Sequence, residues 1–178
     1  MKKLLLLLAL SASTVFADVI QDAQRAFEGG NEAEAFRILE KAAQAGNAQA
    51  LYNLSVFYSN GIATAPDDKK ALQLLEQSAN KGFIDAQKDL VEYYLAQPDF
   101  TRAAKWMKIL ADKGDAAAQY GYALLLLNGQ GVKVDIKQSE KYLRLSMDNG
   151  FQPAHDFIRS LEEKAKAKGT GKNPPAKK

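Results

Sequence analysis

The sequence predicts an all-α fold, an α-solenoid of about four antiparallel helical hairpins with a C-terminal capping helix. Four glycines, Gly46, Gly82, Gly114 and Gly150, are separated by 36, 32 and 36 residues. Each is followed four residues later by alanine, and each is preceded by a small residue eleven positions earlier. A period in the mid-thirties with small residues at fixed offsets is typical of stacked helical hairpins.

The first 17 residues have the pattern of a bacterial export signal. Two lysines precede a leucine block over residues 4–10, and Val15-Phe16-Ala17 has small residues at the positions that signal peptidase requires. The uncharged stretch of 14 residues is shorter than the ~20 that span a bilayer. We therefore expect cleavage after Ala17 and a periplasmic or secreted protein, without integral membrane insertion. The chain has no cysteine, so its stability must come from packing and not from disulfides.

Residues 18–166 are expected to form the repeat domain. Asp67, Asp99 and Asp135 each precede a helical stretch and can cap it, and the repeated glycines can end the helices. The pattern predicts helices over residues 19–28, 31–45, 47–59, 67–80, 83–96, 99–112, 115–128, 135–148 and 151–166.

Small residues are expected where two helices of a hairpin cross closely. We predict that Ala50 faces Ala71 and that Ala118 faces Ser139. Larger side chains should fill the layers between, such as Tyr122 and Leu126 with Tyr142 and Leu145. In the last helix, an apolar stripe opposite a charged face predicts a capping helix. The stripe consists of Ala154, Ile158, Leu161 and Ala165.

Several positions resemble the Sel1-like repeat family, a relative of the tetratricopeptide repeat. The matching residues are Ala48, Ala50, Leu54, Tyr58 and Gly61, then Trp106, then Ala116, Ala118, Gly129, Gly131, Val132 and Asp135. The resemblance covers about residues 20–160 and implies a hairpin solenoid that acts as an adaptor. Exported members of the family bind host proteins, envelope sensors, polar machinery or toxins, so the resemblance implies a protein partner.

The C-terminal end of the chain differs from the rest in its net charge. Residues 167–178 contain prolines, glycines and lysines without large apolar side chains, which predicts a disordered basic tail. The tail is expected to be solvated, with weak contact to an anionic surface as the alternative. The body between signal and tail carries 18 basic and 21 acidic residues, which argues against nucleic acid as a partner.

The sequence offers no catalytic constellation. With one histidine and no cysteine, it predicts no metal site, and no cofactor motif is present. Ser78 and Lys81 match the Ser-x-x-Lys pattern of penicillin-recognising enzymes, but the partner motifs are missing. We therefore predict a protein that is not an enzyme. The alternative is a periplasmic hydrolase acting on cell-wall or β-lactam-like substrates, and a third possibility is a structural scaffold for envelope proteins.

The expected binding surface is the concave face formed by the first helix of each hairpin. If Leu54 and its equivalents are buried, the residues two places before and after them point into the groove. In the last helix these positions are Asp156 and Ser160, with His155 and Arg159 as their neighbours. The candidate site residues are Tyr52, Val56, Lys88, Glu92, Tyr120, Leu124, His155 and Arg159. Tyrosines beside aliphatic and charged residues are typical of a protein-binding hot spot. The alternative is that the tyrosines only pack between helices and that His155 is an exposed residue without a function. The predicted function is an exported adaptor for a protein or peptide, with an envelope regulator or a toxin as candidate partners.

Overall fold

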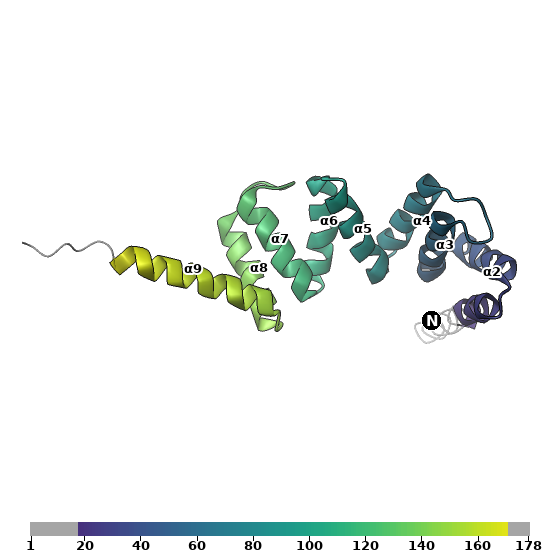
Figure 1. Ribbon diagram of the computed structural model, residues 1–178, viewed down its shortest axis with the longest axis horizontal. Helices are drawn as coiled ribbons and strands as arrows, with labels where there is room; N and C mark the ends of the chain where they lie inside the picture. Colours follow the sequence, from purple (N-terminus) through teal and green to yellow (C-terminus); the bar gives the residue numbers. More distant parts are fainter. Residues whose placement is uncertain (1–17, 171–178) are drawn as a thin grey trace, which may run out of the picture. The chain divides into compact units, whose positions relative to one another are not determined.

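The computed structural model describes residues 18–170, and these are helical with short connections and no strand (Figure 1). The first helical stretch covers residues 18–28. It is followed by α2 (Glu32–Gln44), α3 (Ala48–Asn60), α4 (Asp68–Asn80), α5 (Ile84–Ala96), α6 (Phe100–Asp112), α7 (Ala116–Asn128), α8 (Ile136–Asp148) and α9 (Gln152–Thr170). The predicted helices and the all-α fold class are thus confirmed. The chain divides within α5 into two compact units, Met1–Leu90 and Val91–Lys178.

Local chemistry sets the helix boundaries. The carboxylates of Asp67, Asp99 and Asp135 accept backbone N–H bonds of 2.8, 3.0 and 2.9 Å from the third residue after each. These bonds satisfy N–H groups that have no partner in the first helical turn. At the other end of the helices, the repeated glycines adopt the left-handed conformation, with φ of 93° at Gly114. All three predicted caps are therefore confirmed.

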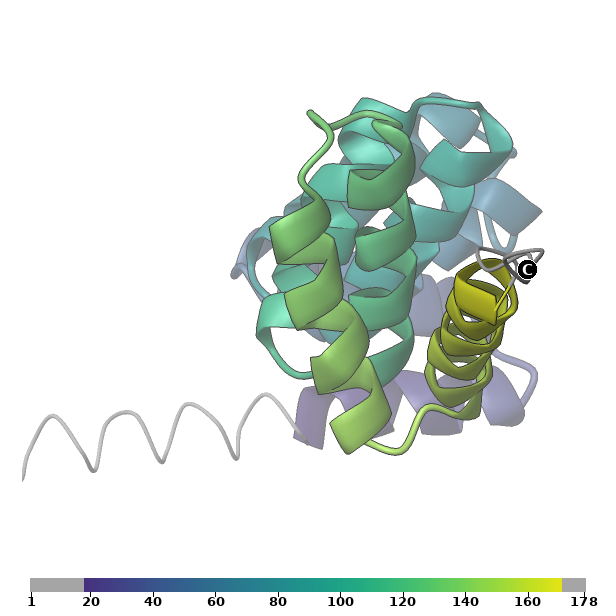
Figure 2. The ribbon, with the colours of Figure 1, turned by 90° about the vertical axis from the view of Figure 1, so that its left-hand side faces the viewer.

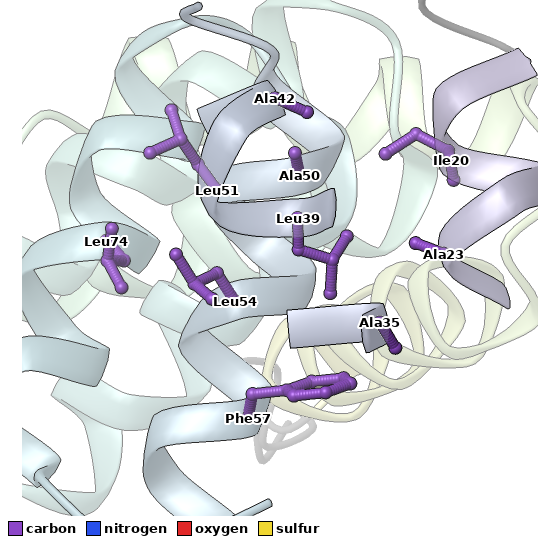
Figure 3. Packing of buried hydrophobic residues seen from close by; sticks show 10 residues of the cluster. All are labelled: Ile20, Ala23, Ala35, Leu39, Ala42, Ala50, Leu51, Leu54, Phe57 and Leu74. Carbon is purple, nitrogen blue, oxygen red and sulfur yellow. The ribbon is translucent and has the colours of Figure 1, made fainter. Parts of the chain in front are cut away.

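In the first unit, the core lies between residues 18–28 and helices α2, α3 and α4 (Figure 3). Its buried residues are Ile20, Ala23, Ala35, Leu39, Ala42, Ala50, Leu51, Leu54, Phe57 and Leu74. The Phe36 and Phe57 rings lie 6.3 Å apart and join α2 to α3. Small residues allow the close approach of the helices, and larger ones fill the layers around them.

In the second unit, α7 and α8 lie side by side (Figure 2). The Tyr122 and Tyr142 rings meet edge to face at 5.1 Å, as the predicted layer requires. The placement of Leu145 in that layer was wrong, because its side chain is 37% exposed. The buried positions of α8 are Ser139, Tyr142, Leu143 and Ser146. Leu145 falls outside this face, and Leu143 takes its place in the core.

The predicted facing pairs of small residues are also wrong. The Ser139 hydroxyl donates a 2.7 Å hydrogen bond to the Ala123 carbonyl, and the Ser146 hydroxyl donates one of 2.6 Å to that of Ala116. These bonds show that the start of α8 lies beside the middle of α7, and its end beside the start of α7. Ala118, in the first turn of α7, therefore does not face Ser139.

The same correction holds in the first unit. The Ser78 hydroxyl bonds the Ala48 carbonyl at 2.6 Å, so the end of α4 lies beside the start of α3. Ala71, at the opposite end of α4, does not face Ala50. Both alanines are nevertheless buried, as expected of small residues in a tightly packed hairpin.

The stripe on α9 is only partly covered. Ala154 is fully buried and Ile158 is half-buried, but Leu161 is 46% exposed and Ala165 is exposed. Figure 1 shows α9 starting beside α8 and then running away from it. The helix continues to Thr170, inside the range predicted as a disordered tail. The remaining tail, residues 171–178, and the predicted signal, residues 1–17, lie outside the described residues.

Candidate functional site

None of the eight predicted site residues is buried. All lie on α3, α5 or α7, the first helices of three hairpins, or on the last helix, α9. The first unit holds the N-terminal patch, which consists of Tyr52, Val56 and Lys88. The second unit holds the C-terminal patch, which consists of Glu92, Tyr120, Leu124, His155 and Arg159. Each unit therefore carries part of the predicted binding surface.

Tyr52 is held between α3 and the start of α5. Its ring lies 5.2 Å from that of Phe83, with a tilt of 46° between the planes. Burial of the phenol, together with its hydrogen bond to the Asp89 carboxylate, raises the pKa of Tyr52 to about 12. The side chain is half-buried, so it offers part of its surface to a partner while its position is fixed.

Tyr120 repeats this arrangement 68 residues later, in the second unit. Its ring lies 5.6 Å from Phe151 and 6.1 Å from Phe157. Phe157 occupies the repeat position that Asp89 holds in the first unit. Both tyrosines pack between helices, as the alternative interpretation expected, and both are half-buried with a part left accessible.

His155 has a structural role that the sequence analysis did not predict. Its Nε2 is 3.0 Å from the Met147 carbonyl, which can only accept, so the proton is on Nε2. At the same repeat position, Gln119 Nε2 donates to the Ala111 carbonyl at 3.1 Å. Gln87 likewise donates to the Ala79 carbonyl at 2.8 Å. The signal that could have found this role is the fixed offset of five residues after the repeated glycine.

The remaining patch residues are aliphatic or charged. Val56 is 37% exposed, Leu124 is half-buried, and Lys88 and Glu92 are exposed. Arg159 forms an exposed ion pair of 2.7 Å with Asp156, one turn earlier on α9. Such a mixture of aromatic, aliphatic and charged surface suits contact with a protein.

Ser78 does not have the setting of a nucleophile. It is fully buried, and its hydroxyl is committed to the Ala48 carbonyl. Among residues 18–170, no group of three His, Cys, Asp or Glu side chains could hold a metal ion. Across the same part of the chain, no helix is both long and apolar enough to cross a bilayer.

The hairpins and the two patches define a helical-repeat protein of the tetratricopeptide-like class. The model of the Sel1 repeat matches residues 29–47, 48–83, 93–115 and 116–151, which is more than half of the chain. The chain therefore belongs to the Sel1 repeat family, whose repeats serve as scaffolds for protein–protein interaction.

Solved structures share the fold. A Sel1 repeat protein from Oxalobacter formigenes is 26% identical, with a TM-score of 0.61 over 80% of this chain and 62% of that one. A protective antigen present in uropathogenic Escherichia coli strains is 30% identical, with a TM-score of 0.53. That match covers 67% of this chain and 27% of the antigen.

Curated relatives include a regulator and a ligase component. The exopolysaccharide production negative regulator of Rhizobium meliloti (strain 1021) is 26% identical over 70% of this chain and 53% of its own length. The ERAD-associated E3 ubiquitin-protein ligase component HRD3B of Arabidopsis thaliana is 29% identical over 62% of this chain and 18% of its own length. The chain spans about half or less of the length of these relatives.

Proposed function

We propose that the protein is an exported adaptor that binds a protein or peptide through the N-terminal and C-terminal patches. The observation that carries the proposal is the placement of all eight patch residues outside the core, on α3, α5, α7 and α9. The interaction role of the repeat family supports it.

The tyrosines are the proposed anchors of binding. Tyr52 and Tyr120 are already oriented by the rings of Phe83 and Phe151. A partner therefore does not have to immobilise free side chains, and tyrosine adds contact area with few rotors to freeze. The exposed aliphatic and charged neighbours would surround these anchors and set the partner's orientation.

Export is the second part of the proposal. Its support is the Lys-Lys start, the short leucine block and the Val-Phe-Ala ending of residues 1–17. Periplasmic or secreted localisation restricts the partner to envelope or extracellular proteins, such as an envelope regulator or a toxin. Mass measurement of the protein from a bacterial envelope fraction should give Asp18 as the first residue. Retention of residues 1–17 would contradict the proposed cleavage.

Site-directed photo-crosslinking tests the binding surface. A photoreactive amino acid at Val56 or Leu124 should capture the same partner from envelope extract, because both side chains border the proposed anchors. The control position is Gln73, which is exposed on α4, a second helix of a hairpin. Capture at Gln73 but not at the two patch positions would contradict the assignment of the patches.

A further inference from the structure

A polar cleft lies between α6 and α8 in the second unit, away from the residues of the two patches. Its volume is about 490 Å³. Helix α6 contributes Lys108 and Asp112, and α8 contributes Lys137, Lys141 and Tyr142. We call this the lysine cleft.

The carboxylate of Asp112 is already satisfied within the cleft. The Lys108 ammonium lies 2.5 Å from its Oδ2, and the Tyr142 hydroxyl donates a 2.5 Å hydrogen bond to its Oδ1. Both donors favour the ionised form, so they hold the pKa of Asp112 below its ordinary value. Asp112 therefore neutralises Lys108 and leaves little capacity for further cations.

Lys137 and Lys141 lie one turn apart on the same face of α8. Neither forms an ion pair with another side chain within residues 18–167. The nearby Asp135 carboxylate accepts the Gln138 N–H at 2.9 Å as the cap of α8. The unused hydrogen-bonding capacity of the cleft thus consists mainly of positively charged donors.

We propose that the lysine cleft binds an acidic segment of a partner protein, with a glutamate or aspartate side chain between Lys137 and Lys141. Two carboxylates at the rim, Asp112 and Asp135, favour this ligand over phosphate. A doubly charged phosphate would lie close to both, whereas a peptide carries single carboxylates, spaced along its backbone. Its N–H groups can also donate to the Asp135 carboxylate. The binding surface is separate from the two patches and adds a second contact on the opposite helices of the hairpins.

The first unit does not repeat the cleft. At the positions 68 residues earlier, Glu40 stands in place of Lys108, Gln73 in place of Lys141, and Leu74 in place of Tyr142. Lys69 is retained in place of Lys137 and Asp67 in place of Asp135, so the first unit keeps only one of the three lysines. The first unit therefore supplies a charge-matched control on the same molecule.

Fluorescence anisotropy with a labelled glutamate-rich peptide tests the proposal on the whole protein. The double variant Lys137→Gln/Lys141→Gln should weaken binding by roughly two- to thirtyfold, because two exposed ion pairs are lost. The control Lys69→Gln/Lys70→Gln removes the same charge and should bind as the wild type does. A peptide with glutamine in place of glutamate should not bind. Equal losses in both double variants would show non-specific charge attraction and overturn the proposal.

A variant that is expected to strengthen binding distinguishes an effect on peptide recognition from an effect on folding. Asp112→Asn removes a negative charge and keeps an oxygen to accept the Tyr142 hydroxyl, so it should strengthen peptide binding. Loss of folding cannot produce that result. Inorganic phosphate and vesicles of anionic phospholipid are the competing probes. Binding of either one without binding of the peptide would contradict the proposal, as would Asp112→Asn failing to strengthen peptide binding.

Discussion

The hydroxyl of Ser146 donates a 2.6 Å hydrogen bond to the carbonyl of Ala116, which ties the end of α8 to the start of α7. The bond between Ser78 and Ala48 has the same length and lies 68 residues earlier. Both serines are fully buried. The α3–α4 and α7–α8 hairpins thus share a buried serine hydroxyl that fixes the register of their two helices.

Replacing either serine should destabilise its hairpin. Ser146→Ala is expected to lower the free energy of unfolding by about 1 kcal/mol, because a buried hydrogen bond is lost. Urea unfolding followed by circular dichroism measures the effect. Ser59→Ala removes an exposed hydroxyl of α3 and should change stability by less than about 0.5 kcal/mol. Equal effects of the two substitutions would show that the buried bond is not important for stability.

Gly131 should tolerate no side chain. A Cβ there would overlap the Phe100 carbonyl oxygen, and the φ of Gly131 is 69°. Gly131→Ala should therefore cost about 3 kcal/mol or more, since overlap with fixed backbone adds to the roughly 1–2 kcal/mol of left-handed strain. The control is Gly150→Ala. Gly150 has a φ of 80° and no atom within 4 Å of an added Cβ, so this variant has the left-handed backbone strain without the overlap. If thermal unfolding shows the same loss of stability for the two variants, Gly131 does not lie as close to the Phe100 backbone as described.

His155 should be replaceable by glutamine. Gln119 makes the equivalent bond to a carbonyl eight residues earlier, so His155→Gln should retain wild-type stability. His155→Ala should lose roughly 0.5–1 kcal/mol, toward the low end because the site is exposed. Denaturant unfolding of the two variants decides between them. A glutamine variant as unstable as the alanine variant would show that glutamine does not replace the histidine contact with Met147.

The contribution of Tyr52 to the free energy of unfolding should change with pH in alkaline solution. Its pKa is raised to about 12, from an ordinary value of 10, because burial and the Asp89 carboxylate disfavour the phenolate. When the pKa of a group is higher in the folded than in the unfolded protein, the group stabilises the fold fully at a pH below its unfolded pKa. This stabilisation is lost as the pH rises through the folded pKa. The stability of the wild type relative to Tyr52→Phe should therefore fall between about pH 10 and pH 12. A constant difference across that range, measured by urea unfolding, would contradict the burial of the phenol.

The helices and their caps were predictable because their causes are local. An aspartate caps the helix that follows it, and a glycine ends the helix that precedes it, as Asp135 and Gly114 do. The facing pairs were not predictable from equal positions within each helix. Antiparallel packing places Ser139 beside Ala123, and only a contact between helices reveals this register.

The candidate site was predictable in part. The positions beside the buried leucines could be predicted to be accessible from helical periodicity, and Tyr52 and Tyr120 are indeed half-buried. Their contacts with Phe83 and Phe151 depend on how the next helix packs, which periodicity does not report. The lysine cleft was missed because Lys108 and Lys137 come from different hairpins, and Glu40 stands at the position of the first unit that is equivalent to Lys108.

The central claim is that Tyr52 and Tyr120 anchor the partner. It is tested most directly by comparing the affinity of the photo-captured partner for the variant Tyr52→Ala/Tyr120→Ala with its affinity for the wild type. Titration calorimetry with the purified partner should show a loss of about 2 kcal/mol or more, or roughly 30-fold, if these tyrosines are hot-spot residues. The variant Tyr52→Phe/Tyr120→Phe keeps the ring contacts and controls for folding, and deletion of residues 168–178 should leave most of the affinity intact. If the alanine variant is folded and binds normally while the truncated protein does not, the tail is the binding element and the two patches are not.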